Sequence, residues 1–178
     1  MGRQRLLSDT VAYVRAHGLG DLTLRQLAEA IGSSHRMLLY HFGSRGGLLA
    51  AVVGEIERDE RVAAAATAAT ATSSTDALRK GWQRLRAPRR AGEERLFYEL
   101  AAMAMQRVPG TEDFRIDFVE PWLGAGDAWG TDRVQMRVDV AVVRGLILDL
   151  LVTGDRKAAD AAFERYVSQR QRASNRRR

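Results

Sequence analysis

Apolar residues recur at helical spacing along nearly the whole chain, and this pattern constrains the fold more than any other feature. No segment shows the convincing alternation of apolar and polar residues that indicates a half-buried strand. Serine, threonine and aspartate residues that favour helix starts, and glycines that favour helix ends, separate the apolar segments. The sequence therefore predicts an all-α protein of about nine helices.

The expected helices follow one another with short connections. Three short helices come first, at about 3–16, 24–30 and 34–40, and Ser44 is expected to cap a long fourth helix. Pro88 cannot continue a helix interior, so the helix that begins at Ser73–Asp76 ends before it. Each remaining helix has a capping residue or a proline or glycine at an end, and we expect them at about 93–108, 111–122, 132–153 and 156–172.

The segment from Thr131 to Thr153 is the most apolar part of the chain. Its valines favour a strand, but its length of about 22 residues between Thr131, a capping residue, and Gly154 favours a helix. Its apolar residues cover two faces, and a helix that is apolar on two faces must bury both. One face can meet its own core. The other predicts contact with a second subunit, so we expect a homodimer formed through the last two helices.

Composition excludes several classes of function. The chain has no cysteine, which excludes disulfides, iron–sulfur clusters and thiol catalysis. No apolar stretch has the length of a signal peptide or a membrane span, so we expect a soluble, cytoplasmic protein. The three histidines lack metal-site spacing, and no nucleophile, histidine and acid occur in a recognisable setting. We predict no catalytic residue, no metal and no cofactor.

Positive charge gathers at the two ends of the chain. Residues 1–54 carry a net charge of +3 and residues 164–178 a net charge of +5, whereas the region between them is nearly neutral. This distribution is compatible with nucleic-acid binding but is weak evidence alone. We expect the arginine-rich run 84–90 to be a solvated loop. We also expect a solvated helix face to carry the acidic residues Glu55, Glu57, Asp59 and Glu60.

Residues 24–42, LRQLAEAIGSSHRMLLYHF, carry the strongest functional signal. Small Ala28 allows two short helices to cross closely, and Gly32 supplies the left-handed turn between them. This arrangement is typical of a helix-turn-helix motif, whose second helix enters the major groove of DNA. At the start of that helix Ser34, His35 and Arg36 face outward, where arginine and histidine can reach base-edge acceptors. An ordinary helix pair with a glycine turn is the alternative.

The wider context of this motif resembles a known family. A leading helix ends at Gly18-Leu19, the stretch from Leu22 to Gly32 follows, and Leu38 to Leu49 reads LLYHFGSRGGLL. Through these motifs residues 6–53 resemble the DNA-binding domain of the tetracycline-repressor (TetR) family of bacterial regulators. The resemblance implies a dimeric repressor that binds a palindromic operator and releases it when a small molecule occupies a larger helical domain.

The resemblance also assigns candidate DNA contacts by position. Two positions depart from the family pattern: Leu39 replaces a phosphate-contacting tyrosine, a role that the neighbouring Tyr40 can take over, and Arg45 replaces a lysine. Phosphate contacts fix the register of a protein on DNA, whereas base contacts read its sequence. The candidates for phosphate contact are Thr23, Arg25, Tyr40, His41, Ser44 and Arg45. The candidates at the start of the recognition helix are Ser33, Ser34, His35 and Arg36.

We therefore expect a DNA-binding domain at residues 1–54, a helical ligand-binding and dimerisation domain at 55–170 and a basic disordered tail at 171–178. Arg144 can hold an acidic ligand, pair across the dimer or point to solvent. Aromatic residues at helical spacing can line a ligand cavity or belong to an ordinary core. The alternative function is a helical-bundle enzyme or small-molecule-binding protein whose N-terminal helices are structural. The candidate ligand-binding residues are Trp82, Phe97, Phe118, Trp122 and Arg144.

Overall fold

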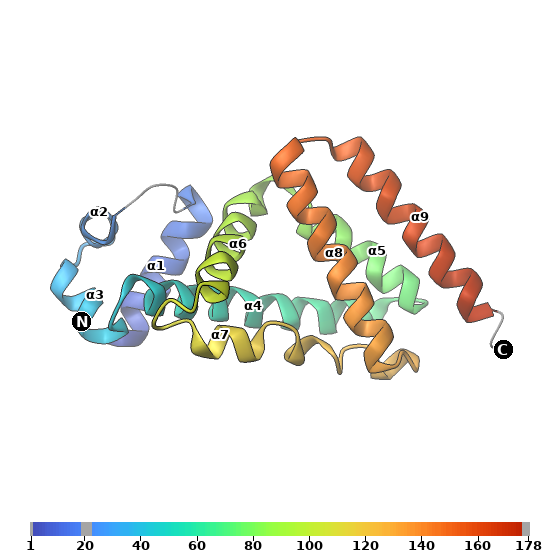
Figure 1. The fold of residues 1–178 in the computed structure, drawn as a ribbon, viewed down its shortest axis with the longest axis horizontal. Helices are drawn as coiled ribbons and strands as arrows, with labels where there is room; N and C mark the ends of the chain where they lie inside the picture. The colour runs from blue at the N-terminus through green and yellow to red at the C-terminus, as the bar shows by residue number, and fades with distance from the viewer. Residues whose placement is uncertain (1, 19–22, 176–178) are drawn as a thin grey trace. The chain divides into compact units, whose positions relative to one another are not determined.

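The fold is helical throughout the part of the chain that the structure, a computed structural model, describes: residues 2–18 and 23–175 (Figure 1). Within these ranges there is no strand, which confirms the predicted all-α class. The described helices are α1 (Arg3–His17), α2 (Leu24–Ala30), α3 (His35–Phe42), α4 (Arg45–Thr70), α5 (Ser74–Leu85), α6 (Ala91–Met105), α7 (Glu112–Asp117), α8 (Arg133–Thr153) and α9 (Arg156–Asn175), with short 3-10 helices η1 (Pro88–Arg90), η2 (Glu120–Trp122) and η3 (Asp127–Trp129).

Most helices begin at side chains that cap them. Thr23 and Gln26 form a reciprocal capping box at α2. Ser34 accepts a hydrogen bond from the backbone of Met37 at α3, and Ser73 accepts one from Asp76 at α5. Such caps satisfy backbone N–H groups that have no partner inside the helix. The cap of α8 is Asp132 rather than the expected Thr131, because the Asp132 carboxylate accepts the backbone N–H of Gln135 at 2.8 Å.

Two expected helix ends are wrong. The helix expected over 111–122 ends at Asp117, and η2 follows it. Pro121 explains the shorter helix, since a proline removes a helical hydrogen bond and disfavours helical backbone in the residue before it. In contrast, α9 continues to Asn175, so the tail expected from residue 171 is helical over 171–175. The rest of that tail, 176–178, lies outside the described residues, as does the expected motif segment 19–22.

The chain packs as two compact units. The first comprises Met1–Glu60 and Pro88–Phe118, and the second comprises Arg61–Ala87 and Val119–Arg178. Helix α4 therefore contributes residues to both units. The two units are defined by packing and not by function. The boundary between functional domains that the sequence predicts at residue 54 therefore stays a prediction.

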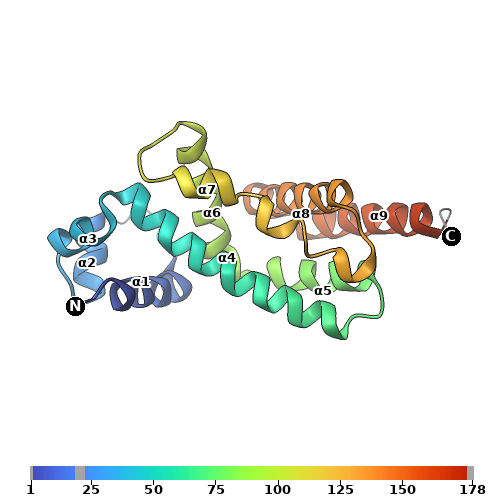
Figure 2. The ribbon, with the colours of Figure 1, turned by 90° about the horizontal axis from the view of Figure 1, so that it is seen from below.

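Helices α1–α3, the first half of α4, α6 and α7 share the core of the first unit. Figure 2 shows the first half of α4 passing between α1 and α7. The apolar residues of α4 recur on one face, as the spacing predicts, and they are buried against side chains from the other helices. Fully buried members of this core include Leu6, Val14, Leu27, Leu38, Leu48, Leu49, Val52, Leu96 and Leu100.

In the second unit α9 packs against both α5 and α8. Ala159, Phe163 and Val167 repeat every four residues along α9 and are fully buried. The indole ring of Trp82 stacks on the ring of Phe163 at 4.8 Å between centroids, and its Nε1 donates to Asp160 at 2.7 Å. This hydrogen bond satisfies the indole N–H in an otherwise apolar contact.

A buried polar network joins α8 to α9. The side chain of Asp139 is 2% exposed, and its Oδ1 accepts hydrogen bonds from the Tyr166 hydroxyl at 2.5 Å and from Arg170 Nε at 2.9 Å. Arg170 also donates to Ser74 and to Thr131. Burial, and then the bond to Asp139, raise the pKa of Tyr166. The network fixes the register of α8 against α9, because each hydrogen bond depends on a particular pair of positions.

Candidate nucleic-acid interface

Helices α2 and α3 cross closely around a tight turn. Leu27 and Ala28 of α2 and Leu38 of α3 are each about 1% exposed, as expected for residues that fill the space between two short helices. Gly32 in the turn has a φ of +66°, the left-handed backbone that the sequence predicts at this position. The geometry is that of a helix-turn-helix motif.

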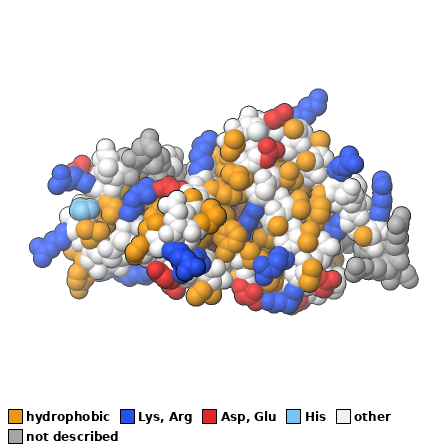
Figure 3. Space-filling view, viewed as in Figure 1, with side chains coloured by type: hydrophobic (Ala, Val, Ile, Leu, Met, Phe, Trp, Pro, Cys, Tyr) orange, Lys and Arg blue, Asp and Glu red, His pale blue; other side chains and the backbone are white. Residues whose placement is uncertain are grey.

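The start of α3 presents polar side chains to solvent. The Ser34 hydroxyl accepts the backbone N–H of Met37 at 3.2 Å, and His35 and Arg36 follow it in the first turn as exposed residues. Ser33 is half-buried in the turn, where its backbone N–H donates to the Ala28 carbonyl at 2.7 Å. Figure 3 shows arginine and histidine side chains on the surface around α2 and α3.

Exposed residues also lie at the start of α2. Thr23 Oγ1 accepts the Gln26 backbone N–H at 3.3 Å, while the Thr23 backbone N–H donates to Gln26 Oε1 at 2.9 Å. Arg25 follows in the first turn and is exposed. A guanidinium there can meet a phosphate of a bound duplex, where it would fix register rather than read sequence.

The residues at the end of α3 differ in accessibility. Tyr40 is 79% exposed, whereas Leu39 is 36% exposed. The Tyr40 side chain is thus exposed, and a phosphate contact by Tyr40 in place of a tyrosine at position 39 stays a prediction. The His41 ring lies edge-on to Tyr40 and is half-buried, and its Nε2 has no hydrogen-bond partner among the described residues.

Ser44 and Arg45 connect the start of α4 to neighbouring segments. Ser44 Oγ accepts the Gly47 backbone N–H at 3.0 Å, which makes Ser44 the expected cap, and donates to the Pro109 carbonyl at 3.3 Å. Arg45 Nη1 donates to Glu99 Oε1 of α6 at 2.5 Å. Both side chains remain partly exposed, so a phosphate would compete with these intramolecular contacts.

Two close glycine contacts, at Gly47 and Gly92, hold the helix-turn-helix segment against its neighbours, and neither is among the expectations from the sequence. A Cβ built on Gly47 would lie 2.2 Å from the Phe42 carbonyl oxygen. A Cβ on Gly92, at the start of α6, would lie 3.2 Å from the Cα of Gly18 at the end of α1. The contact at Gly47 leaves no room for a Cβ, whereas a Cβ at Gly92 would fit only if Gly18 moved by a few tenths of an ångström. The Gly46-Gly47 pair was the signal in the sequence that could have indicated the first contact.

The candidate ligand-binding residues lie in both compact units. Phe97 and Phe118 belong to the first unit, where their rings stack at 5.6 Å. Trp82, Trp122 and Arg144 belong to the second unit, where Trp82 is buried and the other two are half-buried. The stacking contacts of Trp82 and Phe97 are those of core residues, and the ligand-binding role of the set stays a prediction.

Across residues 2–18 and 23–175, no group of three or more histidine, aspartate or glutamate side chains is arranged to hold a metal ion. Among the helices described there, none is long and apolar enough to cross a membrane.

Helices α2 and α3 cross, and a histidine and an arginine are exposed at the start of the second helix. These features define a helix-turn-helix DNA-binding protein, in which further helices follow the motif in the sequence. Residues 6–52 match the sequence profile of the tetR family of bacterial regulatory proteins. The N-terminal segment therefore has the sequence of this family's DNA-binding domain, as the sequence analysis above expects.

Solved structures of similar fold extend over nearly the whole chain. A candidate transcriptional regulator from Rhodococcus sp. RHA1 aligns over 95% of each chain with a TM-score of 0.76 and 20% identity. The multidrug-binding protein EbrR, in complex with imidazole, aligns over 94% of this chain and 88% of its own with a TM-score of 0.65 and 24% identity. A TetR regulator from Legionella pneumophila covers 95% of this chain and 96% of its own, at 17% identity and a TM-score of 0.64. These likenesses establish the fold. A comparison with curated proteins finds no match.

Proposed function

We propose that the protein is a homodimeric, ligand-responsive repressor that binds a two-fold symmetric operator in the bacterial cytoplasm. The observation that carries the proposal is the exposed first turn of α3, where His35 and Arg36 follow the Ser34 cap on a helix braced by α2. An arginine at this place can form two hydrogen bonds with guanine O6 and N7. Exposed Arg25 and Tyr40 flank this turn as phosphate contacts.

A continuous apolar stripe on α8 supports dimer formation. Val134, Val138, Leu148 and Val152 are 75%, 42%, 43% and 76% exposed. Together with exposed Ala141 and Gly145 they are spaced by alternating steps of four and three residues, the period of a coiled-coil seam. Figure 3 shows hydrophobic side chains on the surface over this helix. The buried Asp139 and Ile147 lie on the opposite side of α8, so the stripe is a second apolar face rather than part of the core.

The stripe also suits a two-fold symmetric pairing of α8 with α8 of a second copy. An antiparallel crossing near residue 143 would place Val134 beside Val152 of the second copy, and Val138 beside its Leu148. The two smallest members, Ala141 and Gly145, would then lie at the crossing point, where close approach of the helices requires small side chains. A two-fold interface uses the same surface on both subunits, which a self-complementary stripe provides. We therefore assign the dimer contact to α8 and its neighbour α9.

Dimer geometry connects ligand binding to DNA binding. Two recognition helices enter successive major grooves only if they lie about 34–36 Å apart or a compatible multiple. Helix α4 contributes residues to both compact units, so a ligand that favours another direction of α4 would change that spacing. The ligand shifts the equilibrium only by the difference between its affinities for the two states.

Ethidium is the first probe for an effector site. EbrR, whose fold resembles that of this chain, has been crystallised with ethidium and with imidazole. We propose that Trp122 and Arg144 of the second unit contact the effector. Phe97 and Phe118 in the first unit, and Trp82 in the second, stay the other candidate ligand-binding residues. The fluorescence of ethidium mixed with the free protein measures binding, and Trp122→Ala should weaken it if this residue contacts the ligand. Unchanged affinity in Trp122→Ala and Arg144→Ala would remove these two residues from the site.

The proposed function is tested by binding to DNA. Fluorescence anisotropy should compare duplexes from upstream of the protein's own gene with a scrambled duplex of equal length. We expect sequence-selective binding at physiological salt that saturates at two subunits, or a multiple of two, for each site. If the duplexes bind alike, selection from random DNA follows. A selection that enriches no sequence would contradict the proposal and favour a helical-bundle small-molecule-binding protein or enzyme.

A further inference from the structure

Leu39 is a large apolar residue at the surface of helix α3. The side chains of Leu38 and Phe42 are 1% and 9% exposed and mark the side of α3 that packs in the core of the first unit. Leu39 is 36% exposed. It lies about 100° around the helix from Leu38, because an α-helix has 3.6 residues per turn. The leucine therefore stands at the edge of the exposed face of α3.

His35 and Arg36 lie on the same face as Leu39. They precede it by four and three residues, the spacings at which side chains of a helix are neighbours. Around the helix axis, Leu39 lies between them, about 40° from His35 and about 60° from Arg36. Both of these residues are exposed. A helix that inserts the two polar side chains into the major groove therefore brings Leu39 into the groove as well.

The major groove offers one kind of apolar partner to such a leucine. The base edges there present hydrogen-bond donors and acceptors, and only thymine presents a methyl group. Opposite a donor or an acceptor, the Leu39 side chain would displace water from a polar group without replacing its hydrogen bond, which is costly. Against a methyl group, both apolar surfaces lose contact with water, which is favourable. The residue type at this position thus favours thymine.

We propose that Leu39 contacts a thymine methyl group in the major groove and thereby selects a T·A base pair in each half-site of the operator. The inference rests on the function proposed above, because it requires α3 to be the recognition helix. Leu39 lies about 4.5 Å beyond Arg36 along the helix axis. Successive base pairs are about 3.4 Å apart. The thymine therefore lies within about two base pairs of the one that Arg36 contacts.

The neighbouring residue explains why position 39 is available for a base contact. Leu39 stands where the TetR family pattern has a tyrosine that contacts a phosphate, and a leucine cannot make that contact. Tyr40 is 79% exposed and is the residue proposed above for the phosphate. Register on the DNA and preference for a base pair are then divided between two adjacent side chains.

The methyl group can be removed from the DNA without a change in base pairing. Operator duplexes in which deoxyuridine replaces one thymine in each half-site keep every hydrogen-bonding group and lack only the methyl groups. Fluorescence anisotropy should reveal one position at which the wild-type protein binds more weakly by about fourfold for each half-site, the contribution of one buried methyl group. At that position Leu39→Ala should bind the thymine and deoxyuridine duplexes alike.

Tyr40→Phe is the matched control for Leu39→Ala. It changes the next residue of α3 and removes only a hydroxyl group, so it should keep the wild-type ratio between the affinities for the two duplexes. Leu39→Met, which keeps a long apolar side chain, should also retain a preference for thymine. Any effect of deoxyuridine on the stiffness of the duplex is common to all four proteins and cancels in the comparison. Circular dichroism checks that each variant is folded.

The possible results separate this proposal from the proposed function. If no thymine position is sensitive to loss of its methyl group while selective operator binding is intact, the role of Leu39 is overturned and the regulator function stands. The same conclusion follows if Leu39→Ala is as sensitive as the wild-type protein, because another side chain then contacts the methyl group. Absence of selective binding to any duplex would overturn the regulator function and the role of Leu39 with it.

Discussion

Ion pairing separates the basic residues at the DNA-binding surface into two groups. His35 and Arg36 directly follow the cap of α3, and the described structure assigns them no ion pair that would compete with a base. Arg45, in contrast, donates to Glu99 and belongs to the contact between α4 and α6. An arginine that is already paired can exchange its partner for a phosphate, whereas a base contact requires a side chain that reaches into the groove.

Replacement of Arg36 tests its role in reading the operator. We expect Arg36→Ala to weaken operator binding by about 1–3 kcal/mol and to relax the preference for one base pair in each half-site. Arg25→Ala should weaken binding to all sequences alike and make the salt dependence shallower, because a phosphate contact carries no sequence information. Anisotropy with single-base-pair variants of the operator measures both effects. Unchanged base preference in Arg36→Ala would contradict the assignment.

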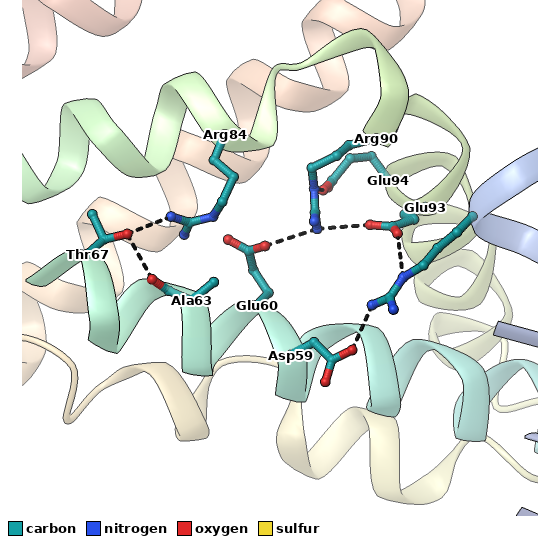
Figure 4. Close-up of polar contacts among 9 residues, drawn as sticks. Asp59, Glu60, Ala63, Thr67, Arg84, Arg90, Glu93 and Glu94 are labelled. Atoms are coloured by element: carbon teal, nitrogen blue, oxygen red, sulfur yellow. Dashed lines mark hydrogen bonds and ion pairs between the residues drawn. The ribbon is translucent and has the colours of Figure 1, made fainter. Parts of the chain in front are cut away.

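At the scale of helices, the starts of helices could be predicted from local chemistry. Contacts between helices could not be predicted in this way. Thr23, Ser34 and Ser73 cap helices within three residues of their own position, so the sequence shows the interaction directly. The expectation of a solvated loop over 84–90 is wrong for Arg90, which pairs with Glu60 on another helix (Figure 4). For the same reason Glu60 is not on a solvated face. The partners are thirty positions apart, and no local pattern indicates such a pair.

The close contact at the start of α4 predicts opposite effects for two substitutions of the same kind. Gly47→Ala should lower the free energy of unfolding by about 1–3 kcal/mol, the usual effect of overpacking, because its Cβ would overlap the Phe42 carbonyl. Gly54→Ala, on the same helix, meets no atom within 4 Å and should raise stability by up to about 1 kcal/mol through helix propensity. Urea denaturation measures both. Equal effects in the two variants would contradict the close contact.

The network around Asp139 should dominate the stability of the pair α8 and α9. Asp139→Ala leaves the Arg170 guanidinium, 8% exposed, without its carboxylate, and we expect a loss of about 3–5 kcal/mol. Tyr166→Phe removes one hydrogen bond and keeps the ion pair, so it should cost about 1 kcal/mol. Chemical denaturation of both single variants and the double variant gives their coupling. A small effect of Asp139→Ala would show that water replaces the network.

At the scale of the whole molecule, the sequence indicated that α8 has a second apolar face. It did not indicate which residues form that face. In the structure the exposed residues form one stripe from Val134 to Val152, and Val142 beside this stripe is half-buried. Periodicity alone assigns residues to faces, whereas the packing of α8 against α9 decides which of them the core covers. Six small or apolar positions exposed in a regular row are typical of a protein interaction site, which supports the proposed dimer contact.

Leu148 lies on this row and gives a direct test of the dimer. We expect Leu148→Arg to convert the protein to a monomer, because two-fold symmetry places the new charge twice in an apolar contact. The side chain is 43% exposed in the single subunit, so the substitution should leave the fold intact, as circular dichroism can confirm. Gln83→Arg adds the same charge at an exposed position of α5 and should remain dimeric. Analytical ultracentrifugation distinguishes the two states. A dimeric Leu148→Arg would contradict the interface, whereas a folded monomer that also loses operator affinity would connect the stripe on α8 to the paired recognition helices.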